Sequence, residues 1–219
     1  LHFTIHSFPT RRSSDLARTF GETLWNQCIH IDPNNNGNGD GSVDKGCKGA
    51  TPETTYNLTD FIHFPVTDAD QKQLQDLSGG QAGTLAVGDT VVLVAMHVGT
   101  REIKRWTWQT FWWTADPNAP DAPSSAKIAE ARPSQMGAPA NHYAMAAGYQ
   151  MLDPAQPLND GENYGTLVPI YNPYLEAGFD PATFKLSRPV VQPESGLTAT
   201  QYGVETNCMT CHGLASYDP

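Results

Sequence analysis

The sequence has few basic residues, few cysteines and no long apolar run, and each shortage excludes a class of protein. Lysine and arginine number 13 against 23 aspartates and glutamates, which gives a net charge of −10. A chain this acidic repels nucleic acid and anionic membrane surfaces and suits a basic partner. No run of about 18 apolar residues occurs, so no membrane-spanning helix is encoded. Nucleophilic triads, phosphate-binding loops and paired-carboxylate signatures are also missing.

Proline and glycine are frequent instead, with 17 and 19 residues, which disfavours long regular helices. Short runs rich in Val, Trp and Thr favour strands. We therefore predict a mainly β fold with short helices and long irregular loops. The length suits a single domain.

The first 16 residues do not look native. His6 to Leu16 reads as the translation of a widely used sequencing-library adapter, and residues 1–5 fit the bases just before it. Such a segment is left out of reasoning about the fold. We expect the native domain to cover residues 17–219, with its true N-terminus missing.

A Cys-Met-Thr-Cys-His motif stands at positions 208–212. On a helical turn, Cys208, Cys211 and His212 would project from one face. Covalent haem attachment needs this geometry, because each thiol adds to a haem vinyl group and the histidine ligates iron. We therefore predict haem c on a C-terminal helical turn, attached through Cys208 and Cys211, with His212 as the proximal iron ligand.

Two other interpretations of this motif are weaker. A structural zinc site needs two more ligands at close spacing, whereas Cys28 and Cys47 lie far upstream. A thioredoxin-like redox pair should follow a strand in a βαβ unit, but the preceding segment is irregular and contains prolines. Because haem is attached to this motif outside the cytoplasmic membrane, we expect a periplasmic or secreted protein whose export signal preceded residue 17.

The two upstream cysteines bracket a stretch dominated by Asn, Gly and Asp. In an oxidising compartment, Cys28 and Cys47 should pair, stabilising the domain by about 3 kcal/mol. Two free buried thiols are the alternative.

Inside this bracket lies a sequence that resembles a calcium-binding loop. Gly41 occupies position 6, but Cys47 stands at position 12, where a bidentate carboxylate belongs. Any calcium site would therefore be weak, and a flexible polar loop is the competing interpretation. The oxygen ligands at positions 1, 3, 5 and 9 would be Asn36, Asn38, Asp40 and Asp44.

The centre of the chain carries its clearest periodicity. Val91 to Val98 is a nearly continuous apolar run that predicts a buried strand. Arg105 to Thr114 predicts its antiparallel partner, with Trp106, Trp108 and Trp112 on one face and Phe111 and Trp113 on the other. Thr67 with Asp70 predicts the start of a helix that ends at Leu77. Residues 141–151 predict a second short helix.

A distal iron ligand must come from upstream of the haem motif. We choose His97, because a strand can hold a ligand rigidly. A hydrogen-bonded core histidine is an equally good interpretation of this residue. The other candidates are Met96, Met136, His142, Met145 and Met151.

Four segments together resemble a poorly characterised group of exported bacterial monohaem cytochrome c family proteins. The likeness covers most of residues 60–213 and implies a single β-rich, monohaem cytochrome c-like domain. Members of the group continue past the haem motif, so we expect this chain to be truncated at its C-terminus as well. The segments are Ala95 to Val98, Trp106 to Trp113, Tyr171 to Glu176 and Asn207 to His212.

Three functions fit these features. An electron carrier with six-coordinate iron and a basic redox partner is favoured. A haem enzyme or ligand sensor with an open sixth position is the runner-up, with His97 or His142 as acid–base groups. A non-catalytic β-rich binding module, in which haem serves structure or sensing, is the third.

Overall fold

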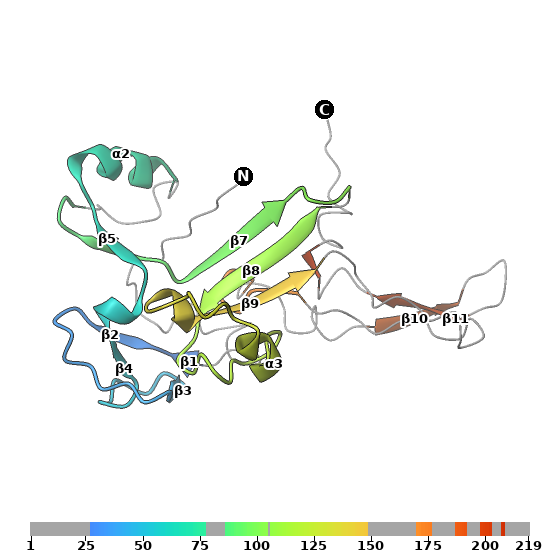
Figure 1. Cartoon of the computed structure of the whole chain (residues 1–219), viewed down its shortest axis with the longest axis horizontal. Coiled ribbons are helices and arrows are strands. Elements are labelled where there is room, and N and C mark those ends of the chain that lie inside the picture. The colour runs from blue at the N-terminus through green and yellow to red at the C-terminus, as the bar shows by residue number, and fades with distance from the viewer. Residues whose placement is uncertain are drawn as a thin grey trace.

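The computed structural model describes residues 27–77, 86–104, 106–148, 170–176, 187–191, 198–202 and 207–208. Within these ranges the chain forms short strands in several small sheets, joined by loops and short helices (Figure 1). The predicted mainly β fold with short helices is therefore confirmed. Neither α-helix in these ranges is long and apolar enough to cross a membrane. The strands are β1 (Gln27–Cys28), β2 (His30–Asp32), β3 (Asp44–Lys45), β4 (Thr55–Asn57), β5 (His63–Pro65), β6 (Thr90–Val92), β7 (Ala95–Thr100), β8 (Thr107–Trp113), β9 (Tyr143–Gly148), β10 (Ser187–Val191) and β11 (Thr198–Tyr202), and the helices are η2 (Leu58–Asp60), α2 (Asp68–Leu77), α3 (Ala126–Glu130) and η3 (Ala140–His142).

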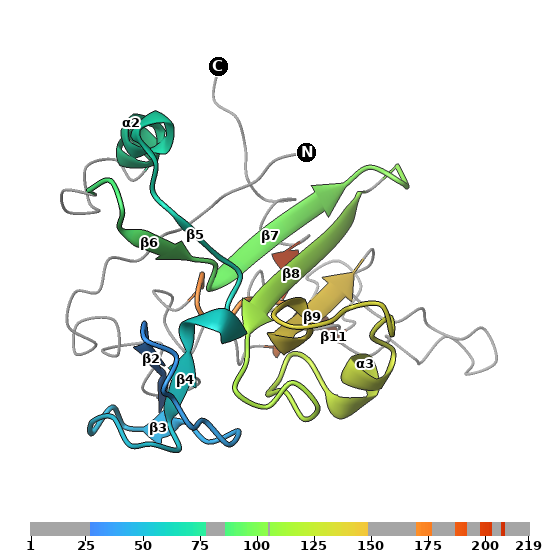
Figure 2. The same cartoon turned by 60° about the vertical axis from the view of Figure 1, so that its left-hand side comes forward.

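The largest sheet is the antiparallel β7-β8-β9 sheet, which crosses the middle of the molecule (Figure 2). Ala95 pairs with Trp112, and Trp112 pairs with Ala144 on the other side. Because side chains alternate along a strand, this register sorts the residues onto two faces. The Trp112 face carries Ala95, His97, Thr110, Trp112, Ala144 and Ala146, and the Trp113 face carries Met96, Phe111, Trp113, Tyr143 and Met145.

The Trp113 face is closed by the chain that precedes the sheet. Trp113 is fully buried, stacks on Phe61 at 4.4 Å between ring centroids, and meets the Tyr56 ring edge-on at 4.9 Å. Its indole N–H donates to the carbonyl of Asp60 at 2.9 Å. This face is thus an aromatic core whose buried indole nitrogen is hydrogen-bonded.

The disulfide predicted between Cys28 and Cys47 is present. It joins the end of β1 to the turn after β3, and these two strands pair antiparallel. β2 and β4 form a neighbouring parallel pair. Gly37 passes so close to β4 that a Cβ there would lie 2.6 Å from the carbonyl oxygen of Thr55, so only glycine fits.

The apolar run from Val91 to Val98 is not one strand, which corrects the prediction. β6 pairs with β5, whereas β7 pairs with β8. Leu93 N–H donates to Ile62 O, and Val94 O accepts from Trp113 N–H, so the backbone changes partners here. The apolar pattern shows burial but carries no information about this change of partner.

Within the segment 141–151, residues 143–148 form β9, so the predicted helix is wrong; residues 141–142 belong to the short η3, and residues 149–151 lie outside the described ranges. Every residue of β9 pairs with β8. Ala144 and Ala146 are small enough to lie against Trp112, and this pairing outweighs the helix preference of alanine.

Two further predictions concern the helix after Thr67 and the first residue of β8. The helix predicted after Thr67 is present as α2, and the carboxylate of Asp70 accepts from the backbone N–H of Thr67 at 3.3 Å. Trp106 was expected on the strand with Trp108. The strand instead begins at Thr107, because Trp106 adopts a positive φ of 64° that no regular strand allows.

Candidate functional site

The Trp112 face is covered by residues that lie far away in sequence. Ile170 is 1% exposed and packs into one cluster with the sheet residues. Tyr174, Leu175 and Cys208 pack against this cluster. The segment 170–176 and the start of the predicted haem motif therefore meet on the same face. The sheet members of the cluster are Ala95, Trp112, Ala144 and Ala146.

Asn172 fixes the segment to β8. Its side chain is fully buried, and its amide nitrogen donates to Thr110 Oγ1 at 2.7 Å and to the carbonyl of Phe111 at 2.9 Å. Its amide oxygen accepts from the backbone N–H groups of Tyr174 and Leu175 at 3.0 and 3.3 Å. Among side chains, only a carboxamide offers two donors and a doubly accepting oxygen in this shape.

Glu176 joins the same segment to His97 on β7. One carboxylate oxygen lies 2.7 Å from His97 Nε2, across 79 residues of sequence. The other oxygen accepts from the backbone N–H of Asn172, and the N–H of Glu176 donates to the carbonyl of Asn172 at 3.0 Å. His97, Thr110, Asn172 and Glu176 thus form one clamp, which we call the His97 clamp.

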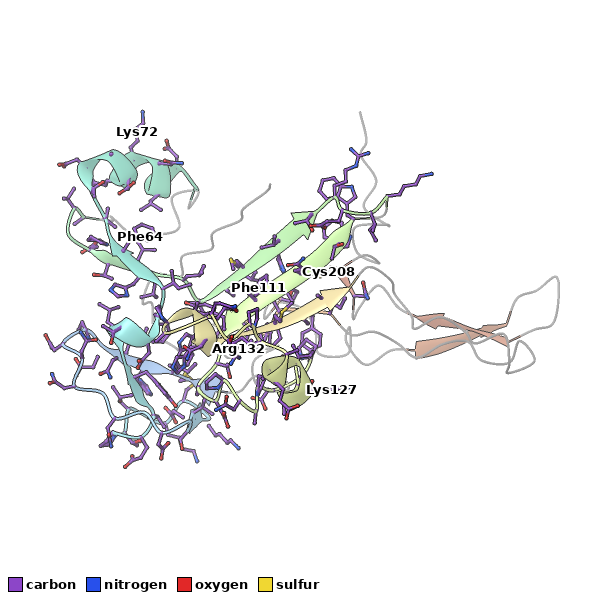
Figure 3. The ribbon with its side chains drawn as sticks, viewed as in Figure 1. Phe64, Lys72, Phe111, Lys127, Arg132 and Cys208 are labelled. Carbon is purple, nitrogen blue, oxygen red and sulfur yellow. A yellow bond between two sulfur atoms is a disulfide. The ribbon has the colours of Figure 1, made fainter. Side chains whose placement is uncertain are left out.

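Cys208 enters the site through the backbone of the clamped segment. Asn207 forms a parallel bridge with Ile170, and the Cys208 thiol donates to the carbonyl of Ile170 at 3.5 Å. Figure 3 labels Cys208 beside the sheet. The first predicted haem-attachment residue therefore lies on the face that carries His97. Cys211 and His212 lie outside the described residues, so the helical turn predicted for the motif is not tested.

Two buried nitrogen atoms on this face have no hydrogen-bond partner within the described part of the chain. They are Nε1 of Trp112 and Nδ1 of His97. Buried polar atoms are nearly always bonded, so each such exception needs an explanation. The Cys208 thiol, the His97 imidazole and the Trp112 indole N–H on one face fit the chemistry of a covalently held haem.

The other candidate distal ligands do not share this face. Met96 and Met145 lie on the Trp113 face. His142 stacks on Trp113 at 5.7 Å, and its Nδ1 lies 3.4 Å from the carbonyl of Thr114. Met136 is exposed in a loop, and Met151 lies outside the described residues. His97 is therefore the one candidate within the described ranges that shares a face with Cys208, although ligation itself stays a prediction.

In the bracketed loop, Asp44 anchors the backbone. It is buried, and its carboxylate accepts from the N–H groups of Gly49 at 2.8 Å and Lys48 at 2.9 Å and from His30 Nε2 at 3.1 Å. The Gly49 hydrogen bond is the main cause of a lowered pKa for Asp44. This structural role was not foreseen from the calcium pattern.

The other predicted calcium ligands are Asp40, Asn36 and Asn38. The Asp40 carboxylate accepts from the Ser42 N–H at 3.0 Å, and hydrogen bonding from the Ser42 side chain lowers the pKa of Asp40. Asn36 and Asn38 lie exposed in the same loop. The described residues contain no group of three His, Cys, Asp or Glu side chains that could hold a metal. Calcium binding stays a prediction.

Comparison with known proteins gives no match of any of the three kinds sought, protein-family models, curated proteins and solved structures. The site therefore rests on its own residues. Asn172 and Glu176 belong to the segment from Tyr171 to Glu176 that resembles the cytochrome group, but the sequence indicates no role for either residue. The signal that could have found them is local: Asn before Pro, with an acid four residues on, is typical of an Asx turn.

Proposed function

We propose that this chain is a c-type cytochrome that holds one haem through Cys208 and Cys211, with His212 as the proximal iron ligand, and transfers electrons outside the cytoplasm. The observation that carries the proposal is the position of Cys208, which packs on the sheet face where His97 Nδ1 and Trp112 Nε1 are buried without partners among the described residues. The Cys28–Cys47 disulfide supports an oxidising compartment.

A bound haem would supply a reversible one-electron couple. Around it, the polypeptide has two tasks. Cys208 and Cys211 would hold the group covalently, and the His97 clamp would hold the imidazole of His97 in place as the candidate second iron ligand. A carboxylate that accepts from a ligating histidine orients the ring and makes it a stronger ligand, which is the role we assign to Glu176. The acidic chain suits a basic redox partner.

One observation favours the second candidate, a haem enzyme or ligand sensor with an open sixth position. His97 Nε2 is already engaged by Glu176, and Nδ1 is buried. Ligation by His97 would therefore need iron at the buried Nδ1; if iron does not reach this atom, the sixth position is left for a small molecule. His97 and Glu176 would then act as an acid–base pair beside that position.

Covalent attachment is tested by acid–acetone extraction of the full-length protein produced with a cytochrome c maturation system. One haem should stay with the polypeptide, because thioether bonds survive conditions that remove ligated haem. Replacing both attachment residues, Cys208→Ala with Cys211→Ala, should abolish retention. Complete extraction from the wild type would contradict the proposal.

The carrier and the enzyme are separated by carbon monoxide binding to the ferrous protein. If His97 ligates, the wild type should bind slowly and His97→Ala rapidly. The matched control is His142→Ala, which removes a histidine stacked on the Trp113 face and should behave as the wild type. Rapid binding by the wild type would establish the open position, and a six-coordinate spectrum unchanged by His97→Ala would move the role to another residue.

A further inference from the structure

The hairpin that joins β7 to β8 ends in a tip formed by residues 101–106, of which 105 lies outside the described ranges. In both views this end of the hairpin extends away from the other labelled elements (Figure 1, Figure 2). The N–H of Trp106 donates to the carbonyl of Ile103 at 3.0 Å, which closes the turn. The side chains of Ile103 and Trp106 therefore begin at the two ends of one tight turn.

The tip combines exposed apolar and basic side chains. Ile103 and Trp106 are each 41% exposed, although both are large and hydrophobic. Arg101 and Lys104 are also exposed. In the sequence, three of the 13 basic residues of the chain fall between positions 101 and 105, with Glu102 as the single acid. An acidic protein thus concentrates positive charge and apolar surface at one projecting point.

The exposed tryptophan is held in place rather than free to turn inward. Trp106 has a φ of 64°, which is unfavourable for a bulky side chain and is found mostly where function requires it. Its ring lies 6.4 Å from that of Trp108, and a Cβ at Gly99 would meet it at 3.8 Å, so the ring rests against β7 and β8. The backbone adopts an unfavourable conformation, and Trp106 nevertheless stays 41% exposed.

We propose that this tip docks on an anionic lipid surface, independently of any haem. Arg101 and Lys104 would meet the phosphate groups, while Ile103 and Trp106 would enter the boundary between headgroups and acyl chains. Tryptophan prefers this boundary because its ring is apolar and its N–H is polar. The strength of binding at a membrane interface increases with the buried apolar area and with electrostatic attraction to anionic lipids, and the tip supplies both. An acidic protein would satisfy the basic residues but offers no reason for the exposed isoleucine.

The net charge of −10 does not prevent this docking. At physiological salt, charges are screened over about 8 Å, so a projecting tip reaches the surface while the acidic remainder is largely screened. The carboxylate of Glu102 accepts a hydrogen bond from the Thr100 hydroxyl, which lowers the pKa of Glu102 and favours its charged form. The segment 101–105 still has an excess of positive charge, with three basic residues against this one acid.

The experiment is flotation of the full chain with vesicles of phosphatidylcholine, with and without about one third phosphatidylglycerol. We expect binding to the anionic vesicles that weakens with salt. The charge variant Arg101→Glu with Lys104→Glu should lose affinity by about tenfold or more. The apolar variant Ile103→Ser with Trp106→Ser should lose a similar factor while keeping the salt dependence.

Matched controls lie elsewhere on the molecule. Lys72→Glu on α2 and Lys127→Glu on α3 reverse exposed charges, and Phe64→Ser on β5 removes an exposed apolar side chain (Figure 3). These three variants should bind within about twofold of the wild type. Absence of wild-type binding, equal binding to neutral vesicles, or equal losses in the controls would overturn the proposal. Salt-sensitive binding to polyglutamate without vesicle binding would assign the tip to an acidic protein instead.

Discussion

Two adjacent tryptophans show how differently the two faces of the central sheet are built. Trp112 and Trp113 are both fully buried. Trp113 is enclosed by aromatic rings, and its N–H is bonded to the carbonyl of Asp60. Trp112 lies among alanines and Ile170, and its N–H has no partner within the described residues.

This difference separates a structural face from a candidate functional one. On the Trp113 face, buried polar groups have hydrogen-bond partners. The Tyr143 hydroxyl, for example, donates to Leu93 O at 2.6 Å and accepts from Ile62 N–H at 3.1 Å. The Trp112 face instead gathers Cys208 and the His97 clamp. Polar atoms that are buried without a partner among the described residues are costly in a simple core, so the two on this face need an explanation.

The largest effect expected is at Trp113. Trp113→Phe removes the N–H that binds Asp60 O and leaves space in the aromatic core, so the free energy of unfolding should fall by roughly 2 to 3 kcal/mol. Trp112→Phe also leaves space, but it removes an N–H that is buried without a partner among the described residues, so the net loss should be smaller, no more than about 1 kcal/mol. Urea unfolding of both variants measures the difference. Equal losses would mean that the two faces do not differ in this way.

A smaller effect on folding stability is expected for the Trp113 face at high pH. Burial raises the pKa of Tyr143 to about 12. The unfolded chain loses this proton near pH 10, before the folded protein does, so stability is intact below about pH 10 and falls as the pH rises toward 12, by roughly 1 to 2 kcal/mol. Tyr143→Phe should flatten this alkaline fall. An unchanged slope in the variant would place the titration elsewhere.

The smallest change in stability is expected on the Trp112 face. Glu176→Gln keeps the shape of the clamp but removes its charge, so the free energy of unfolding should change by less than about 1 kcal/mol. The reduction potential of the haem-loaded protein should nevertheless rise, because a carboxylate behind His97 favours ferric iron. Glu102→Gln, at the exposed hairpin tip, is the control and should leave the potential unchanged. A shift of equal size in both variants would refute a specific role for Glu176.

Local patterns predicted those features whose causes lie within a few residues. Thr67 and Asp70 form the predicted cap of α2 because both partners belong to one turn. Phe111 and Trp113 lie on the predicted face of β8 because alternation is a property of the strand itself. Cys28 and Cys47 pair because no other upstream cysteines exist to compete.

Contacts between residues far apart in the sequence determined the features that local patterns did not predict. The segment of β9 is rich in alanine and became a strand because β8 offered it a complete row of hydrogen bonds. No property of His97 alone reveals that its partner is Glu176, because that choice depends on how the segment 170–176 lies across the sheet.

The sequence by itself determined the mainly β character, the disulfide and the motif that predicts haem attachment. Composition, residue spacing and side-chain chemistry can each be read from the sequence without knowledge of distant contacts. Only the tertiary structure decided which face of the sheet receives Cys208 and which buried nitrogen atoms have no partner among the residues that the structure describes. Packing is the physical reason: burial and hydrogen bonding between residues far apart depend on the path of the whole chain, which no local pattern encodes.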